Sequence, residues 1–478
     1  MNRLAFKSIF MESTTFNHIA NTQLRPRDQS PTAAAARSGQ FIDMLRSKGL
    51  LKDITHEKLS LTEDIELTIY SLAYVVPANE TDGHLTGDII LTHGVSLDPV
   101  EALSKAGGEL CERFPLLLYK KRDFLIGSVA HLHQGGHTYL DPANLAGFSD
   151  RQKQWFPNRT FDKHSIFAWT EGHSLTSNKP TLLPAQLVFW NYCRDYGGFV
   201  EPLIKEANTS GTGGYFSLEE ALLAGIYELI QRDGFLIYWL NNQPPPRIEA
   251  DQAQDNELQK LLTGLRQSGL KAVFLDTTSD FGVPSCVCFS LDVSGSYPYI
   301  ALGAGCGMNP VAVLKHALIE SLMIRDWIHK NNVQFNLPIY YQPFRTLGVD
   351  IRERAGLWAL PTESHKKAMD HFLSGPNMSF ADFARRQRHF ASKTGELAHV
   401  LSNFKSLGPN YDIFYYRSAH KLLREVGYES VHVIIPALLP LYMKEENATL
   451  GARRIREVSE KLGFTASDNI NPLPHPFL

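Results

Sequence analysis

The sequence predicts an α+β fold in which strands and helices are mixed along most of the chain. From residue 65 onward, apolar extended runs alternate with longer helical patterns. Three helices begin at strong capping residues, each shortly after a glycine. The chain has 478 residues, 43% of them hydrophobic and 20% charged, which suits two or three ordinary domains, or one large domain with an appendage.

The predicted elements follow in order along the chain. Residues 1–60 are polar and irregular apart from an alanine run and a short helix expected around 41–51, so we expect an N-terminal appendage there and one large domain over 61–478. The run 431–443 is the most apolar, but prolines interrupt it, so it is expected to be a buried strand and turn. Apolar runs predict strands over residues 65–76, 182–192, 272–275, 283–291 and 431–435.

Three helix starts share one capping pattern. Asp98, Ser217 and Asn309 can each accept the free amide protons of a first helical turn. Proline follows the first and third caps, and a glutamate three residues after the first and second caps completes a capping box. Glycines precede all three caps: Gly94, Gly213 with Gly214, and Gly305 with Gly307.

A glutamate occupies the same position in all three helices, eleven residues after the cap: Glu109, Glu228 and Glu320. The positions fourteen residues after the cap hold Glu112, Gln231 and Met323. Arginines follow at Arg113, Arg232 and Arg325. We infer three helices in a common register, with a common origin as one explanation.

The charged positions lie within otherwise apolar turns. Most Glu and Arg pairs four residues apart lie on solvated faces, and that reading stays open here. Burial is favoured, because these helices are apolar nearly all round and a buried charge needs a partner, a metal or a polyanion. Carboxylates suit Mg²⁺ and arginines suit phosphate. The sequence has neither a P-loop nor the kinase motifs, so a nucleotide site must be built in another way.

The same residues resemble the YcaO family, whose ATP site is formed by Glu-rich helices. S-K-A-G-G-E-L-C-E-R over 104–113 is similar to the family's first nucleotide motif, and the segment 213–233, ending in E-L-I-Q-R-D, is similar to the second. A-L-I-E-S-L-M-I-R over 317–325 resembles the third, and W-T-E-G-H-S-L with L-P-A-Q-L-V within 169–188 resembles the stretch between the first two. The resemblance covers about residue 65 to the end.

The resemblance implies a YcaO-type fold with mixed sheets, in which buried Glu-bearing helices form a site for ATP and Mg²⁺. The implied metal ligands are Glu109, Glu112 and Glu228. The implied nucleotide-binding residues are Lys105, Glu112, Arg113, Gln231, Arg232, Glu320 and Arg325. Gln231 replaces the usual second glutamate but can still offer an oxygen to Mg²⁺, whereas Met323, where the family often has Gln, cannot replace a hydrogen bond.

The last residues, N-P-L-P-H-P-F-L over 471–478, form a Pro-rich tail. Taken alone, such a tail indicates a disordered end or a peptide-domain ligand. Pro472, Pro474 and Pro476 reproduce the P-x-P-x-P tail typical of azoline-forming members of the family. The resemblance therefore implies a rigid extended strand in the active site, with these prolines and the Leu478 carboxylate as catalytic elements.

The function implied is ATP- and Mg²⁺-dependent cyclodehydration of Cys, Ser or Thr in a ribosomally made precursor peptide, as in thiazole/oxazole-modified microcins and other bacteriocins. Backbone thioamidation is the alternative within the family, and the tail disfavours it. Gln231 and Met323 keep a third hypothesis open, a non-catalytic scaffold that binds nucleotide or peptide.

The resemblance also implies partners. The first sixty residues are too few for a leader-binding domain, so we expect a leader-binding, ubiquitin-activating-enzyme-like protein supplied in trans, and in many systems a flavin dehydrogenase. Dimers are common in the family, which leaves a homodimer open. The net charge of −3 argues against nucleic-acid binding. The five cysteines, without a C-x-x-C pair, the missing secretion signal and the missing membrane span indicate a cytoplasmic protein.

Three weaker signals are set aside. His131, His133 and His137 would share a face of a strand, but no carboxylate or cysteine is near enough in sequence to favour a metal site. Cys286 and Cys288 are expected to be packed thiols. The basic segment 380–404 is a helix candidate with a solvated face, and only weakly a docking site for the substrate leader or a partner.

Overall fold

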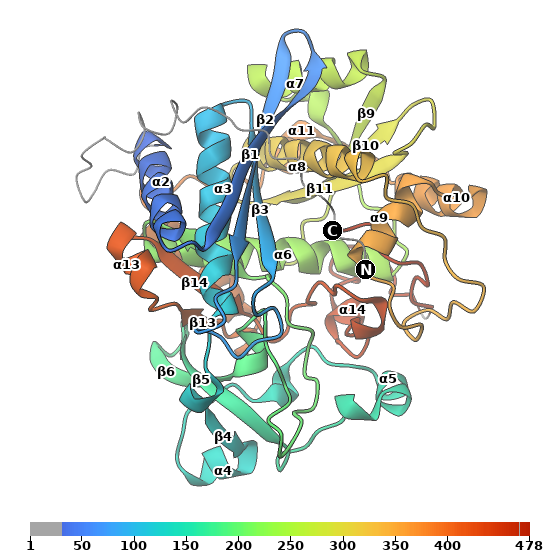
Figure 1. Cartoon of the computed structure of the whole chain (residues 1–478). Coiled ribbons are helices and arrows are strands. Elements are labelled where there is room, and N and C mark those ends of the chain that lie inside the picture. Colours follow the sequence, from blue (N-terminus) through green and yellow to red (C-terminus); the bar gives the residue numbers. More distant parts are fainter. Residues whose placement is uncertain (1–30, 468) are drawn as a thin grey trace.

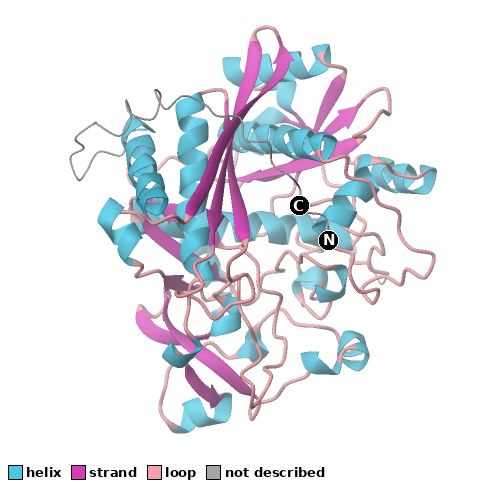
Figure 2. Cartoon of the chain, in the orientation of Figure 1, coloured by secondary structure: helices cyan, strands magenta, loops and turns pink. Residues whose placement is uncertain are grey.

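The computed structural model describes residues 31–467 and 469–478, which form three β-sheets covered by helices (Figures 1 and 2). Strands and helices are mixed along the described chain, which confirms the predicted α+β class. Each sheet ends in a strand that leads into, or closely precedes, one of the three helices singled out above. This arrangement positions the candidate site.

The first sheet consists of the antiparallel strands β1 (Leu51–Thr62), β2 (Ile65–Val75) and β3 (Ile89–Ser96). Helices α2 (Pro31–Ser47) and α3 (Pro99–Arg113) lie side by side against it (Figure 1). A domain boundary at residue 60 would cut through β1, so residues 31–60 are part of this layer, while residues 1–30 of the expected appendage lie outside the described residues. The shared core includes Phe41, Leu72, Tyr74, Leu103 and Leu110.

The second sheet has six strands in the order β4-β5-β13-β14-β7, with β6 paired to β5. The long helix α6 (Leu218–Leu240) packs against β7 and β14 and runs through the centre of the molecule (Figure 1). Every residue of α6 from 229 to 240 is buried, as expected of a helix that is apolar nearly all round. The strands are β4 (Leu125–Ser128), β5 (Ile166–Ser174), β6 (Lys179–Pro184), β7 (Thr212–Tyr215), β13 (Phe414–Arg417) and β14 (Glu429–Ile434).

The third sheet has five strands in the order β11-β10-β9-β8-β12. Helix α8 (Pro310–Lys330) packs against β10 and β11, and α7 (Asn256–Gln267) packs against β9. Cys286 and Cys288 on β10 are buried, packed thiols, as predicted, and this burial raises the pKa of both thiols. The strands are β8 (Arg247–Glu249), β9 (Leu270–Asp276), β10 (Ser285–Asp292), β11 (Ile300–Cys306) and β12 (Asn377–Ser379).

The remaining helices are shorter and connect or cover the sheets. They are α4 (Val129–Gln134), α5 (Asp150–Trp155), α9 (Ile351–Ala359), α10 (Glu363–Phe372), α11 (Phe380–Ala384), α12 (Lys393–Ser406), α13 (Lys421–Val426) and α14 (Arg454–Glu457). None of the helices within residues 31–467 and 469–478 combines the length and the apolar character that a membrane span requires.

Most expected strands are confirmed. Residues 65–76, 272–275, 283–291 and 431–435 coincide with β2, β9, β10 and β14, and residues 431–443 form a buried strand and turn. The strand expected over 182–192 is wrong beyond Pro184, because the chain enters a 3₁₀ turn at Ala185–Leu187. The apolar residues that suggested a strand, Leu187, Val188 and Phe189, are instead buried in a loop.

Two expected helices differ in extent. The helix expected around 41–51 is α2, which begins near the alanine run and ends before Gly49, whose φ of 68° no longer fits a right-handed helix. The basic helix expected over 380–404 is broken into α11 and α12, because Ser392 caps a new helix by accepting the amide of Gly395.

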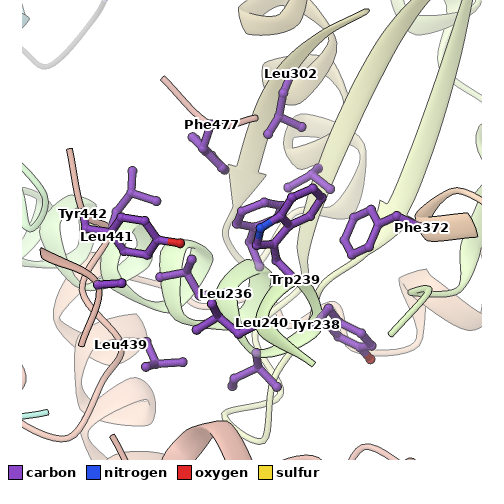
Figure 3. Packing of buried hydrophobic residues seen from close by; sticks show 14 of the residues in the cluster. Leu236, Tyr238, Trp239, Leu240, Leu302, Phe372, Leu439, Leu441, Tyr442 and Phe477 are labelled. Carbon is purple, nitrogen blue, oxygen red and sulfur yellow. The ribbon is translucent and has the colours of Figure 1, made fainter. Parts of the chain in front are cut away.

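A central core joins segments that are far apart in the sequence. Trp239 of α6, Phe372 of α10, Tyr442 from the loop after β14 and Phe477 of the C-terminal tail converge there (Figure 3). The rings of Trp239 and Phe372 lie 5.0 Å apart and nearly perpendicular. The tail is therefore part of the core of the folded chain.

Candidate nucleotide-binding site

Three strand–helix units repeat one local geometry, as their capping residues predicted. The side chains of Asp98, Ser217 and Asn309 each accept backbone amides of the first turn of α3, α6 and α8. Four residues before each cap lies Gly94, Gly213 or Gly305. A Cβ atom on these glycines would lie only 2.1, 2.0 and 2.3 Å, respectively, from a carbonyl oxygen in the helix that follows. Glycine therefore lets each strand lie tightly against its own helix.

The glutamate in each helix caps the strand that precedes it. Each carboxylate accepts a backbone N–H from, or next to, the strand at the end of its sheet: β3, β7 or β11. These amides would otherwise be unpaired at a sheet edge. The N···O distances are 2.5 Å from His93 to Glu109, 2.8 Å from Gly211 to Glu228 and 2.6 Å from Ala304 to Glu320.

The three units close into a ring. Helix α3 of the first unit contacts strand β7 of the second, α6 of the second contacts β11 of the third, and α8 of the third contacts β3 of the first. Each helix thus touches its own strand and the edge strand of the next unit. The three sheet edges, and the glutamates that cap them, are thereby gathered around one region of the molecule.

Electrostatic contacts connect the three units. Burial, and then the nearby carboxylates of Glu109 and Glu228, raise the pKa of Glu112 to about 8, against the opposing effect of Arg113. Glu112 of the first unit therefore lies close to the carboxylate of the second. Burial lowers the pKa of His316 on α8, and that histidine also feels the charges of Glu320, Lys105 and Arg232 from the three helices.

The two predicted arginines of the first two units pair with their own glutamates. Arg113 lies 2.7 Å from Glu109, and Arg232 lies 3.3 Å from Glu228. The third unit differs, because Ile324 holds the equivalent position. Arg325, one residue later, lies 3.4 Å from Asp292 on β10, so the structure does not bring it to Glu320 in the same way.

The other predicted nucleotide-binding residues vary in their surroundings. Lys105 pairs with Glu101 at 2.9 Å and donates to the Val95 carbonyl at 3.2 Å. Gln231 is buried on α6, and Met323 packs against the core between α8 and the third sheet. The thioether of Met323 supplies no strong hydrogen-bonding group.

The residues present fit a magnesium–nucleotide complex. Arg232 is buried with Nε and Nη1 lacking a hydrogen-bond partner in the described structure, and each of these N–H groups can donate to an acceptor oxygen of a ligand. No three His, Cys, Asp or Glu side chains in residues 31–467 and 469–478 are grouped tightly enough to hold a metal alone. Mg²⁺ usually keeps several waters and binds one or two carboxylates together with substrate phosphates, which agrees with this arrangement.

The tail docks beside this site. The ring of Phe477 lies 4.0 Å from the Arg232 guanidinium, and Leu478 packs against a small apolar cluster that includes Ala301 of β11 and Ile328 of α8. Pro474 and Pro476 are buried, while Pro472 is exposed. The tail pairs with no strand of the described chain. Its carbonyls instead accept from side chains, with Tyr341 on Pro472 and Trp358 on Pro474, each at 3.0 Å.

The sequence analysis missed four residues around the site. His93 supplies the edge amide that Glu109 binds, and Lys205 has a pKa lowered to about 8 by burial, with Glu228 opposing that shift. His316 and Phe477 are the others. Phe477 belongs to the Pro-rich tail, but no local pattern indicated that its ring, or the other three residues, would lie at this site. Conversely, His131 and His133 lie on helix α4, so they do not share a strand face.

Comparison with known proteins identifies the family of this chain. The model of the YcaO cyclodehydratases, described as binding ATP and Mg²⁺, matches residues 93–439. A heterocyclase solved with substrate and cofactor is 18% identical with a TM-score of 0.68, and the alignment covers 91% of this chain but 57% of that longer chain. The present chain thus spans little more than half of that heterocyclase.

Two further structures share the fold. YcaO from Methanopyrus kandleri, bound to AMPPCP and Mg²⁺, is 15% identical with a TM-score of 0.59, covering 84% of this chain and 91% of that one. A chain of the Escherichia coli microcin synthetase McbBCD complex is 13% identical with a TM-score of 0.56, covering 88% and 96%. Because the matched family model spans most of the chain and all three glutamate-bearing helices, this protein belongs to the YcaO family.

Proposed function

We propose that this protein uses ATP and Mg²⁺ to convert Cys, Ser or Thr residues of a ribosomally made precursor peptide into azolines. The observation that carries the proposal is the ring of three units that gathers Glu109, Glu228 and Glu320 at converging sheet edges. The docked tail beside Arg232 supports ring formation as the chemistry. The fold shared with a heterocyclase and with a nucleotide-bound YcaO protein agrees with this proposal.

In this proposal, different residues of the chain bind the metal, the phosphates and the peptide. Glu109, Glu112 and Glu228 would hold Mg²⁺ together with phosphate oxygens, and Arg113 and Arg232, which pair with two of these glutamates, would bind phosphate. When bound, ATP supplies the phosphoryl group that turns the peptide's amide oxygen into a leaving group. The buried prolines and the Leu478 carboxylate of the tail would line the reacting amide and keep water out.

In the peptide, the Cys, Ser or Thr side chain forms a bond to the preceding carbonyl carbon and gives up its proton. The former carbonyl oxygen accepts the phosphoryl group and leaves as phosphate, while the amide nitrogen loses its proton and forms a C=N bond. The peptide therefore loses one water per ring, and one ATP becomes ADP and phosphate. Lys105, Gln231, Glu320 and Arg325 remain proposed nucleotide contacts in this scheme.

Mass spectrometry of the peptide tests this function. The protein would be incubated with its precursor peptide, its leader-binding partner and Mg-ATP. We expect a mass loss of one water per ring, with one phosphate released for each ring. Nucleotide binding without peptide modification would favour the scaffold hypothesis, which Gln231 and Met323 motivate. Replacement of a peptide oxygen by sulfur, a mass gain, would favour thioamidation.

Partners and location belong to the same proposal. A leader-binding, ubiquitin-activating-enzyme-like protein would present the peptide, and a flavin dehydrogenase would oxidise azolines to azoles. The E. coli neighbour is itself part of a microcin synthetase complex, which agrees with a multi-protein assembly. The cysteines of the described chain are all free thiols, as expected in the reducing cytoplasm.

A further inference from the structure

We propose that Phe477 is a positioning residue for the nucleotide, acting through Arg232, so that the phosphate-binding side of the site is complete only while the tail is docked. This inference rests on the proposed nucleotide site. It adds a residue outside the P-x-P-x-P prolines and gives the tail a role in nucleotide binding, separate from its proposed contact with the reacting amide.

Arg232 is held from two directions. Its Nη2 lies 3.3 Å from a carboxylate oxygen of Glu228, and the Phe477 ring lies 4.0 Å from the centre of its guanidinium group. The two remaining nitrogens, Nε and Nη1, are buried without a partner in the described structure. Because burying an unpaired N–H is unfavourable, this orientation is best explained by an acceptor that arrives later. A phosphate has the negative charge and the acceptor oxygens that these donors need.

Phe477 can orient Arg232 because it is itself fixed. Its side chain is 1% exposed, and its ring meets that of Phe235 on α6 at 5.2 Å. An aromatic face attracts a guanidinium group without competing for its N–H donors. Stacking therefore restrains the arginine while leaving two donors available for a ligand.

His475, two residues before Phe477, anchors the tail independently of any nucleotide. His475 is fully buried, its Nδ1 accepts from the backbone N–H of Phe477 at 3.2 Å, and the Arg354 guanidinium lies against its ring. Nε2 of the same ring lies 3.2 Å from the Tyr442 carbonyl oxygen. Arg354 also binds the Tyr442 and Met443 carbonyls, at 3.0 and 2.8 Å. Arg354 and His475 thus connect the tail to the loop after β14.

Two consequences follow from this chain of contacts. Loss of the Phe477 ring should weaken nucleotide binding, because Arg232 would have to be ordered by the ligand. By thermodynamic reciprocity, a bound nucleotide should also strengthen docking of the tail.

Calorimetric binding of Mg-AMPPCP, without peptide or partner, tests the inference. We expect Phe477→Leu to weaken binding by about 3- to 30-fold, and Phe477→Tyr, which keeps the ring, to remain close to the wild type. Phe372→Leu is the matched control, because Phe372 is buried in the same core but does not contact Arg232. That control should lose stability without losing affinity.

A double-mutant cycle separates positioning from a general packing effect. In an Arg232→Lys background, Phe477→Leu should add little further loss of affinity, since the ring would have no guanidinium to orient. Additive losses, or equal losses in Phe477→Leu and Phe372→Leu, would overturn the inference. Hydrogen exchange of residues 471–478 should slow on nucleotide binding, and unchanged exchange would also contradict it. Failure of the wild-type protein to bind Mg-AMPPCP would instead contradict the proposed function.

Discussion

At the scale of single residues, the candidate site is a group of half-buried carboxylates, of which Glu112 interacts with both Glu109 and Glu228. Glu109 and Glu228 are each tied to an arginine and a strand-edge amide, so their positions are fixed before any ligand binds. Glu112 lies between them without an arginine of its own. Carboxylates this close repel one another, which a purely structural helix pair would not need. A divalent cation bound among them would neutralise that repulsion.

The glutamates themselves give the first prediction. We expect Glu109→Gln and Glu228→Gln each to lower turnover by at least about 100-fold, because each removes a charge that faces the metal. Both proteins should stay folded, since the glutamine oxygen can still accept the strand-edge amide. Glu219→Gln, in the first turn of the helix that carries Glu228, is the control and should remain active. Full activity of both variants would show that these helices do not form the site.

Glu112 gives a prediction about pH. Its pKa of about 8 means that it is mostly protonated at pH 7, whereas a metal ligand must be ionised. Binding of Mg-AMPPCP should therefore release a proton near pH 7, and the affinity should rise as the pH approaches 8. Calorimetry in buffers of different ionisation enthalpy measures this release. The pH dependence should be lost in Glu112→Gln, and its persistence there would assign it to another group.

At the scale of elements, the repeated unit is a strand, a tight turn and a capped helix. The glycines before the caps set the distance between strand and helix. Gly213→Ala should lower the free energy of unfolding by about 1–3 kcal/mol, because its Cβ would lie 2.0 Å from a backbone carbonyl oxygen that cannot move freely. Denaturant unfolding measures the change. Gly198→Ala, where no atom lies within 4 Å of the added Cβ, should be nearly neutral, and equal effects would contradict this reading.

Local signals were enough to predict much at this scale. The caps Asp98, Ser217 and Asn309 fix where three helices begin, and counting from them predicted the shared register of the glutamates. Extended apolar runs predicted β2, β9, β10 and β14. The strand predicted over 182–192 is too long, because a buried loop is as apolar in sequence as a buried strand. The turn that begins after Pro184 is what ends the strand.

At the scale of the whole molecule, the site arises where three sheets meet edge to edge around one region. The ring of contacts between the units depends on packing over hundreds of residues, so no local pattern could predict it. The same is true of Phe477 on Arg232 and of Lys205 near Glu228, which are brought together by the chain's long-range path. The separate pairing of Arg325 with Asp292 was equally hidden from the sequence.

The central claim is that the glutamate-bearing helices gather around one magnesium-bound nucleotide, and a structure of the protein with Mg²⁺ and AMPPCP tests it most directly. We predict a metal ion about 2.1 Å from carboxylate oxygens of Glu109, Glu112 or Glu228, with phosphates on Arg113 and Arg232 and the tail still docked. A nucleotide bound elsewhere, with no phosphate on either arginine, would contradict the account.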